Sequence, residues 1–386
     1  MHKSFRSKWL FYPAVLIFLL LGGCCKPVID IPAERSLLIY MAGDNDLSHY
    51  LYANIETLKG GFIPQNGNII IYFDAVDAPP RLFRLVKQGA HVVEELIEEY
   101  PQENSADPQV LTRCLLRMRE LYPAGDYALI LSSHATGWLP YGTYGSTFFR
   151  QHTGLPAGVD YPVVKTFAVD GRREMELGEL VSAIPYPLSF ILFDACLMGG
   201  IEVVYALRDV ADKIVASPAE ILATGFPYDQ IMQPMFLPQP DLEEVCNAYY
   251  RYYNGQSGLY RSATIALYHT KALPQLATSV KAIFEKNRDQ VASFNPNQLQ
   301  YYCRVTPHLF YDLDDFIKSI ADPADHESFS EALKKVVVYK FATPSFLEIP
   351  IDRYGGISTY IPVGTQTVLR AAYKETEWNR AVGLLE

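Results

Sequence analysis

Residues 188–207, with the sequence LSFILFDACLMGGIEVVYAL, contain the pattern that decides the fold. The apolar run at 188–193 is short and nearly continuous, which is typical of a strand buried on both faces of a sheet. Asp194 and Cys196 follow at its end, and apolar residues then recur at helical spacing. A strand, a turn and a helix are therefore predicted, with the cysteine placed where the strand ends.

Other apolar runs of the same kind alternate with helical patterns along the chain. They lie in SLLIYMAG (36–43), NIIIYFDA (68–75), YALILSS (127–133) and DKIVAS (212–217). The helical pattern at 108–121 is preceded by Asp107, and Pro108 is a good first residue for a helix. This alternation predicts an α/β fold with a mostly parallel central sheet.

Two regions are less regular. Residues 81–100 alternate weakly, which predicts a hairpin or further strands. From about residue 231 the pattern becomes more helical, with late strands expected at 264–268 and 356–361. We therefore expect a core up to residue 230, followed by a helical or mixed region.

The composition narrows the class of protein. The chain has 386 residues, of which 49% are hydrophobic and 20% charged, so a large packed core is expected. Its formal net charge of −10 argues against a nucleic-acid partner, because such proteins present a basic face.

The N-terminus has the pattern of an export signal. Basic residues at 3–8 precede a short apolar stretch at 10–21, which falls short of the roughly 20 residues of a spanning helix. The sequence LGGC that follows resembles a bacterial lipobox. This resemblance implies cleavage before Cys24, a diacylglycerol group on its sulfur, and an exported protein anchored to a bacterial envelope membrane, expected to be the outer membrane, on its periplasmic or surface face. An ordinary signal peptide with incidental cysteines is the alternative.

The cysteine pattern argues against a structural zinc site. The six cysteines form no CxxC motif, and the chain has no HxxxH motif of the kind that completes a zinc site. If Cys24 carries lipid, five thiols remain, so at least one cannot pair with another in an oxidising compartment. The state of four of them is left open: Cys25, Cys114, Cys246 and Cys303.

A candidate base and a candidate nucleophile each follow a predicted strand. His134 comes directly after YALILSS and Cys196 directly after LSFILFDA. In a parallel sheet such residues meet at the carboxyl edge, where a cysteine at a helix start has its thiolate favoured and a histidine can move protons. Each also has a plainer interpretation, since Cys196 could be a small buried hydrophobe, His134 a loop hydrogen-bonder and Asp194 a helix cap. Their coincidence at two strand ends favours catalysis.

The first predicted strand ends in further polar residues. Asp44, Asn45 and Asp46 lie after SLLIYMAG, on the same predicted edge. A turn with an N-cap and a role in the site both fit this pattern, and both interpretations stay open.

Several segments resemble the clostripain-like cysteine peptidases, relatives of caspases, legumains and gingipains. The main ones are LSSHATGW and FDACLMGGIEVVYALRDVADKIVASPAE, and LLIYMAGDNDLS, YPAGDYALIL and MELGELVSAI match in the same order. The resemblance is good over residues 36–228. It implies a caspase-haemoglobinase-like three-layer α/β/α sandwich with a catalytic core at 36–230. Together with the N-terminal pattern, this gives a signal peptide at 1–23, a tether at 24–35, and a helical or mixed C-terminal region at 231–386 packed on the core.

The resemblance also implies roles for single residues. Cys196 would be the nucleophile and His134 the general acid and base, while the backbone N–H groups of Ala135 and Cys196 would form the oxyanion hole. Asp194 would lie in the S1 pocket and pair with Arg or Lys of a polypeptide substrate. Family members are often assisted by Ca²⁺ and self-cleaved between the histidine and cysteine segments, which makes Arg150 and Lys165 candidate cleavage sites. No cofactor is required for the chemistry.

The sequence departs from the family pattern at two places. Ala135 replaces the usual glycine after the histidine, which would be strained if the position needs a positive φ. The stretch SPAEILATGFPYD (217–229) replaces a Pro-Gly-x-Gly-Trp motif and leaves Glu220 and Asp229 as its only acids.

Three functions are consistent with these observations. The first is a lipid-anchored cysteine endopeptidase that cleaves after Arg or Lys. The second is a catalytically inactive lipoprotein that binds peptides on the same fold. The third is an amidase or transpeptidase using the same dyad. Retention of both His134 and Cys196 favours the first.

Overall fold

The computed structural model describes residues 33–140, 142–143, 174–304, 307–362 and 367–385. The part from Pro32 onward forms one compact unit. Within the described ranges, no helix combines the length and the apolar character needed to cross a bilayer.

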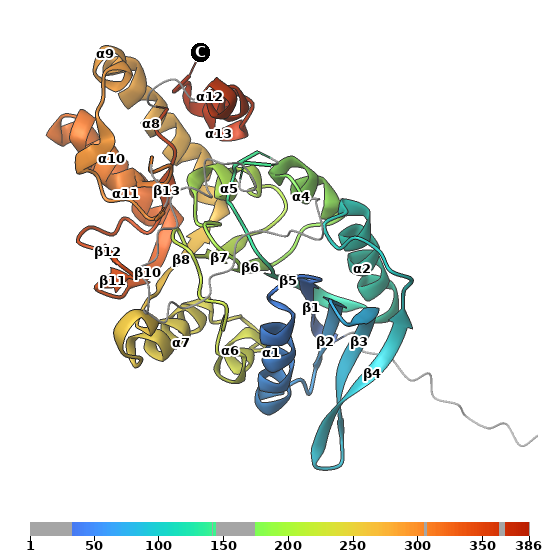
Figure 1. Ribbon diagram of the computed structural model, residues 1–386. Helices are drawn as coiled ribbons and strands as arrows, with labels where there is room; N and C mark the ends of the chain where they lie inside the picture. The colour runs from blue at the N-terminus through green and yellow to red at the C-terminus, as the bar shows by residue number, and fades with distance from the viewer. Residues whose placement is uncertain (1–32, 141, 144–173, 305–306, 363–366, 386) are drawn as a thin grey trace, which may run out of the picture. The chain divides into compact units, whose positions relative to one another are not determined.

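A single nine-stranded sheet organises this unit (Figure 1). In spatial order its strands are β10 (Val337–Ala342), β8 (Thr264–His269), β7 (Lys213–Ala216), β6 (Phe190–Asp194), β5 (Ala124–Ser132), β1 (Ala33–Gly43), β2 (Gly67–Ala75), β3 (Ala78–Gln88) and β4 (His91–Glu99). The five central strands from β7 to β2 are parallel, and the strands at both edges are antiparallel. The predicted mostly parallel central sheet is confirmed.

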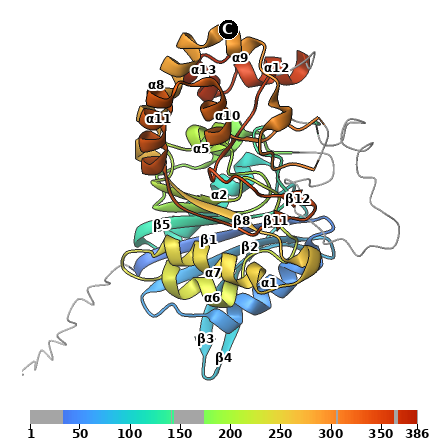
Figure 2. The same ribbon diagram turned by 90° about the vertical axis from the view of Figure 1, so that its left-hand side faces the viewer.

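Helices cover both faces of the sheet (Figure 2). One face carries α1 (Ser48–Gly61), α6 (Tyr228–Met235) and α7 (Leu242–Asn254). The other carries α2 (Pro108–Leu121), α4 (Leu177–Ala183), α5 (Ile201–Ala206), α8 (Leu273–Lys286), α9 (Arg288–Ala292), α10 (Leu313–Ile320), α11 (Pro323–Val336), α12 (Thr367–Lys374) and α13 (Glu377–Val382). This arrangement gives three layers. The short strands β9 (Tyr311–Asp312), β11 (Ser345–Phe346), β12 (Ile349–Pro350) and β13 (Ser358–Thr359) pair in two small sheets.

Local signals in the sequence account for the central elements. All five residues of β6 are buried, as its unbroken apolar run requires in the middle of a sheet. Helix α2 begins where Asp107 accepts a hydrogen bond from the backbone N–H of Gln109, with proline at the first turn. The weakly alternating stretch forms the β3–β4 hairpin, whose turn contains Gly89 at a φ of +62°.

The C-terminal part of the chain is helical and also completes the sheet. Strand β8 agrees with the strand expected at 264–268, and β10 adds the outermost position beside it. At the late strand expected near residue 356, only Ser358–Thr359 is extended. The apolar pattern of the sequence changes near residue 230, but β8 and β10, which follow that residue, belong to the same sheet as the earlier strands.

Helix α5 is joined to the C-terminal part through Glu202. Its carboxylate is fully buried and accepts hydrogen bonds from the backbone N–H of Tyr360 and the hydroxyl of Thr359, at 2.8 and 3.0 Å. Nearby, the N–H of Ser358 donates to the carbonyl of Gly199 at 3.0 Å. Burial raises the pKa of Glu202 to about 7, although the two hydrogen bonds oppose this shift.

We expect this carboxyl group to make the folded protein less stable as the pH rises. Because the pKa of Glu202 is higher in the folded chain than in the unfolded one, protonation favours the folded state. Its contribution is complete below about pH 4.5 and is lost as the pH passes 7, a change of roughly 3 kcal/mol. Glu202→Gln should remove this part of the pH dependence. Urea unfolding at pH 5 and pH 8 measures it, and an equal pH dependence in both proteins would contradict the assignment.

Candidate active site

The two predicted catalytic residues follow strands that end at the same level. Strands β5 and β6 are parallel neighbours, and Ser132 pairs with Asp194 in their register. The hydroxyl of Ser132 also donates to Oδ2 of Asp194 at 2.8 Å. His134 and Cys196 each lie two residues beyond this pair, so the chain brings both to one position on the carboxyl edge of the sheet.

The turn that contains Cys196 is fixed by the segment after β7. The N–H of Leu197 donates to the carbonyl of Ala219 at 2.9 Å, and the N–H of Gly199 donates to the carbonyl of Ser217 at 2.8 Å. A Cβ atom on Gly199 would lie 2.5 Å from the backbone nitrogen of Pro218, so only glycine fits there. Leu197 has a φ of +61°, a strained conformation of the kind that collects at functional sites.

The loop after His134 packs directly against this turn. Gly137 has a φ of +66°, and a Cβ atom there would lie 2.8 Å from the carbonyl oxygen of Leu197. The histidine and cysteine loops therefore meet backbone to backbone.

Ala135, which stands where the family usually has glycine, does not have a strained backbone conformation. Among the described residues, Leu197 and Leu347 are the non-glycines with a positive φ, and Ala135 is not one of them. An alanine would be strained only at a positive φ. In the turn that follows His134, the residue with a positive φ is Gly137 and not Ala135.

The thiol of Cys196 is buried against the segment that follows β7. Its Sγ lies 3.1 Å from the backbone nitrogen of Ile221, which donates to it, and 3.6 Å from the carbonyl oxygen of the same residue. The hydroxyl of Thr264 holds this segment by accepting from the N–H of Ala219 at 3.2 Å. Residues 219–221 thus form the wall next to the sulfur.

His134 contacts a carboxylate from the first strand end. Its Nε2 lies 2.6 Å from Oδ1 of Asp46. The His134 side chain is 10% exposed, whereas the Asp46 side chain is 70% exposed. A carboxylate in this place orients the ring and stabilises its protonated form. Of the two interpretations left open for residues 44–46, this contact favours a role in the site for Asp46. Asn45 makes the turn, with its side-chain oxygen accepting from the N–H of Leu47.

Asp194 is fully buried at the end of β6. Its Oδ2 accepts hydrogen bonds from the hydroxyls of Ser132 at 2.8 Å and Tyr228 at 2.9 Å. Burial and the neighbouring carboxylate raise the pKa of Tyr228, so its hydroxyl stays protonated and remains a donor. Two hydroxyl groups thus hold this buried carboxylate two residues before Cys196.

Two charged residues close to Cys196 form an ion pair. Glu220, next to Ile221, accepts two hydrogen bonds from the guanidinium of Arg304, at 2.8 and 2.9 Å. Sequence reasoning singled out Glu220 as an acid of this stretch but gave no signal for Arg304, which lies 84 residues away.

Some predicted site residues fall outside the described ranges. These are Cys24, Cys25, Arg150 and Lys165. The other four cysteines are all buried: Cys114, Cys196, Cys246 and Cys303. Over the described part of the chain, no group of three His, Cys, Asp or Glu residues is placed to hold a metal ion.

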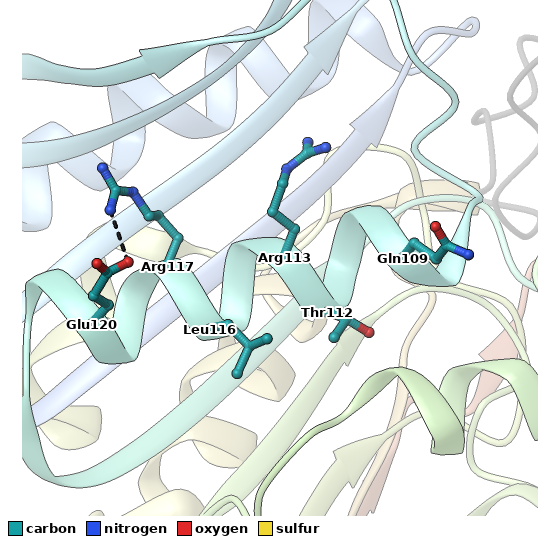
Figure 3. Close-up of a pocket in the computed structure, with 6 residues that line it drawn as sticks. All are labelled: Gln109, Thr112, Arg113, Leu116, Arg117 and Glu120. Atoms are coloured by element: carbon teal, nitrogen blue, oxygen red, sulfur yellow. Dashed lines mark hydrogen bonds and ion pairs between the residues drawn. The ribbon is translucent and has the colours of Figure 1, made fainter.

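A surface groove of about 400 Å³ runs along α2, lined by Gln109, Thr112, Arg113, Leu116, Arg117 and Glu120 (Figure 3). Arg117 and Glu120 pair within it at 2.8 Å. Neither His134 nor Cys196 lines this groove, so it is not the candidate active site.

Comparison with known proteins agrees with this geometry. Residues 39–380 match the model of the clostripain family, Peptidase C11. Over 226 residues the chain is 25% identical to clostripain from Hathewaya histolytica. That match covers 51% of this chain and 41% of that protein, so the chain spans less than half of the curated relative's length.

Two solved structures resemble the whole fold. One is an inactive zymogen C11 protease from Parabacteroides distasonis, with 33% identity, a TM-score of 0.79, and coverage of 92% of this chain and 99% of that one. The other is a secreted C11 cysteine protease from Bacteroides thetaiotaomicron in complex with an irreversible peptide inhibitor, with 26% identity, a TM-score of 0.76, and coverage of 90% and 98%. From the paired strand ends, the matching folds and a family match over almost its entire length, we conclude that this chain belongs to the clostripain family.

Proposed function

We propose that this protein is a cysteine endopeptidase that cleaves polypeptides after Arg or Lys. The observation that carries the proposal is the placement of His134 and Cys196, each two residues beyond the paired strand ends Ser132 and Asp194. The similarity to C11 proteases, one of them solved with an irreversible peptide inhibitor, supports the same reaction.

The expected chemistry proceeds through a thioester. The Cys196 thiolate attacks the carbonyl carbon of the scissile bond, and the backbone N–H groups of Cys196 and Ala135 stabilise the oxyanion. His134 donates a proton to the leaving amine as the C–N bond breaks. Water then attacks the thioester carbon while His134 accepts its proton, and the C–S bond breaks to release the carboxylic acid and return the thiolate. Asp46 keeps the imidazole oriented in both steps.

The preference for a basic side chain is the finer part of the proposal. Asp194 lies two residues before the nucleophile, and a carboxylate in the wall of S1 forms charge-assisted hydrogen bonds with Arg or Lys. Its two hydroxyl donors hold the carboxylate in place for this role.

A panel of fluorogenic peptides with Arg, Lys, Asp or Asn at P1, with and without Ca²⁺, tests this preference. We expect Arg and Lys to be cleaved best. Asp194→Asn should lower kcat/KM for them by roughly 10- to 100-fold, the value of a hydrogen bond to a charged group. Turnover of the neutral P1 peptide serves as the control and should change little. Equal losses for all four peptides would show that Asp194 supports the fold and does not select the substrate.

We further propose that the protein is exported and anchored by lipid on Cys24. The basic, apolar and LGGC segments support this, and a similar C11 protease is described as secreted. Cys24→Ser should release the protein from the membrane fraction, and unchanged membrane association would reject the anchor.

A further inference from the structure

The wall beside Cys196 contains an acid that is already paired with an arginine of this chain. Glu220 precedes Ile221, whose backbone N–H lies 3.1 Å from Sγ of Cys196. The Glu220 carboxylate binds Nε and Nη2 of Arg304 at 2.8 and 2.9 Å. This is the two-point geometry by which proteins recognise a free guanidinium.

The position of Glu220 suits contact with the residue that is cleaved. During attack the substrate carbonyl carbon must come to about 3–3.5 Å from the sulfur. The P1 side chain branches one bond from that carbon, so a long basic side chain starts beside residues 219–221. Glu220 is then within reach of its charged end.

The charges around Arg304 hold it at this position. Burial alone would disfavour its charged form. The hydrogen bonds and attraction to Glu220, with smaller effects of Glu348 and the Cys196 thiolate, nevertheless keep the pKa of the guanidinium above its ordinary value. Arg304 is thus a permanent cation close enough to Cys196 to interact with its thiolate. Its side chain is 24% exposed, and that of its partner Glu220 is 9% exposed.

We propose that Glu220 is a second acid of the S1 subsite and that Arg304 occupies it as an internal competitor of the substrate's basic P1 side chain. The inference rests on the proposed peptidase function and deepens it. A basic substrate must displace Arg304 from Glu220 before its own guanidinium or ammonium can bind there. Arg304 thereby occupies the acid that would bind the substrate. The apparent affinity for basic ligands falls in proportion to the fraction of molecules in which Glu220 is not bound to Arg304.

Binding of Nα-acetyl-L-arginine amide, measured by calorimetry, tests this independently of turnover. All variants are made in the Cys196→Ala protein. Arg304→Gln is expected to bind the ligand about tenfold more tightly than its parent, because the acid is left open. Glu220→Gln should bind it at least tenfold more weakly than Arg304→Gln. Nα-acetyl-norleucine amide should show neither difference.

Two further variants separate competition from a structural ion pair. Arg113→Gln removes a guanidinium that makes two hydrogen bonds to Glu103, away from the site, and should leave affinity unchanged. Arg304→Lys keeps the charge but loses the two-point contact, and should bind the arginine ligand with intermediate affinity.

The outcomes decide between the two explanations. If Arg304→Gln binds the ligand no more tightly than its parent, the inference is wrong, whatever the enzyme cleaves. If Arg304→Gln does not fold, Arg304→Lys decides, and an affinity no higher than the parent's overturns the inference. Tighter binding in a protein without peptidase activity would support the subsite and refute only the proposed function.

Discussion

Replacing Cys196 with alanine is expected to abolish peptide hydrolysis, lowering kcat by at least about 10⁴-fold. Of the other described cysteines, Cys114 lies in α2 and Cys246 in α7, and neither directly follows a central strand. Without the sulfur the thioester cannot form, and only binding and the oxyanion hole remain. Initial rates on an Arg-P1 fluorogenic peptide measure the loss.

Cys246→Ala is the matched control for this substitution. Cys246 is also buried, in α7, and burial raises the pKa of its thiol, so it stays protonated and unreactive. Its removal should leave kcat within about twofold, as expected for a side chain outside the site. Activity that persists in Cys196→Ala, or disappears in Cys246→Ala, would contradict the identity of the nucleophile.

His134→Ala should lower kcat by about 10³-fold or more, because the leaving amine then departs without a proton donor. The effect should appear in kcat more than in KM, since the imidazole acts on the reacting atoms and not on the substrate's side chains. Single-turnover rates measure the acylation step directly. A variant that retains wild-type acylation would remove His134 from the mechanism.

The contact between His134 and Asp46 predicts a smaller effect of the same kind. Asp46→Asn should lower kcat by roughly 10- to 100-fold, well below the about 10⁴-fold loss known for a buried triad aspartate. The difference follows from the 70% exposure of the Asp46 side chain, because water screens its charge. Asp44→Asn, at the same strand end, is the control and should leave kcat unchanged.

The centre of the fold is readable from sequence because its strands are buried on both faces. FILFD in β6 and LLIYMA in β1 have no polar alternation, which only a covered, parallel sheet explains. The edges are not readable in this way. Strand β10 has a mixed pattern, VVYKFA, and its place beside β8 depends on contacts between residues more than 60 positions apart.

The placement of His134 and Cys196 just beyond neighbouring strand ends was predictable for the same reason as the sheet. His134 and Cys196 follow apolar runs directly, and parallel register brings such positions together. The burial of Asp194 was not predictable, because it depends on the hydroxyls of Ser132 and Tyr228, from a neighbouring strand and a later helix. The resemblance assigns Asp194 to the wall of S1, and the two hydroxyl donors that hold its carboxylate come from residues 62 and 34 positions away along the chain.

Long-range polar contacts account for most of what the sequence did not reveal. Asp46 and His134 are 88 residues apart, and a polar turn after a strand is common whether or not it has a function. The pair formed by Glu220 and Arg304 has no periodicity or motif that would indicate it. Only the fold brings Arg304 to Glu220, next to the residue that contacts Cys196.

The most direct test of this account is covalent labelling of the wild-type protein with a peptide acyloxymethyl ketone that has Arg at P1. Intact-mass spectrometry followed by peptide mapping should find one adduct per chain, on Cys196. The adduct should be absent in Cys196→Ala and form far more slowly in His134→Ala. A protein that remains unlabelled, or an adduct on Cys114, Cys246 or Cys303 in place of Cys196, would contradict the central claim that Cys196 and His134 form the catalytic dyad.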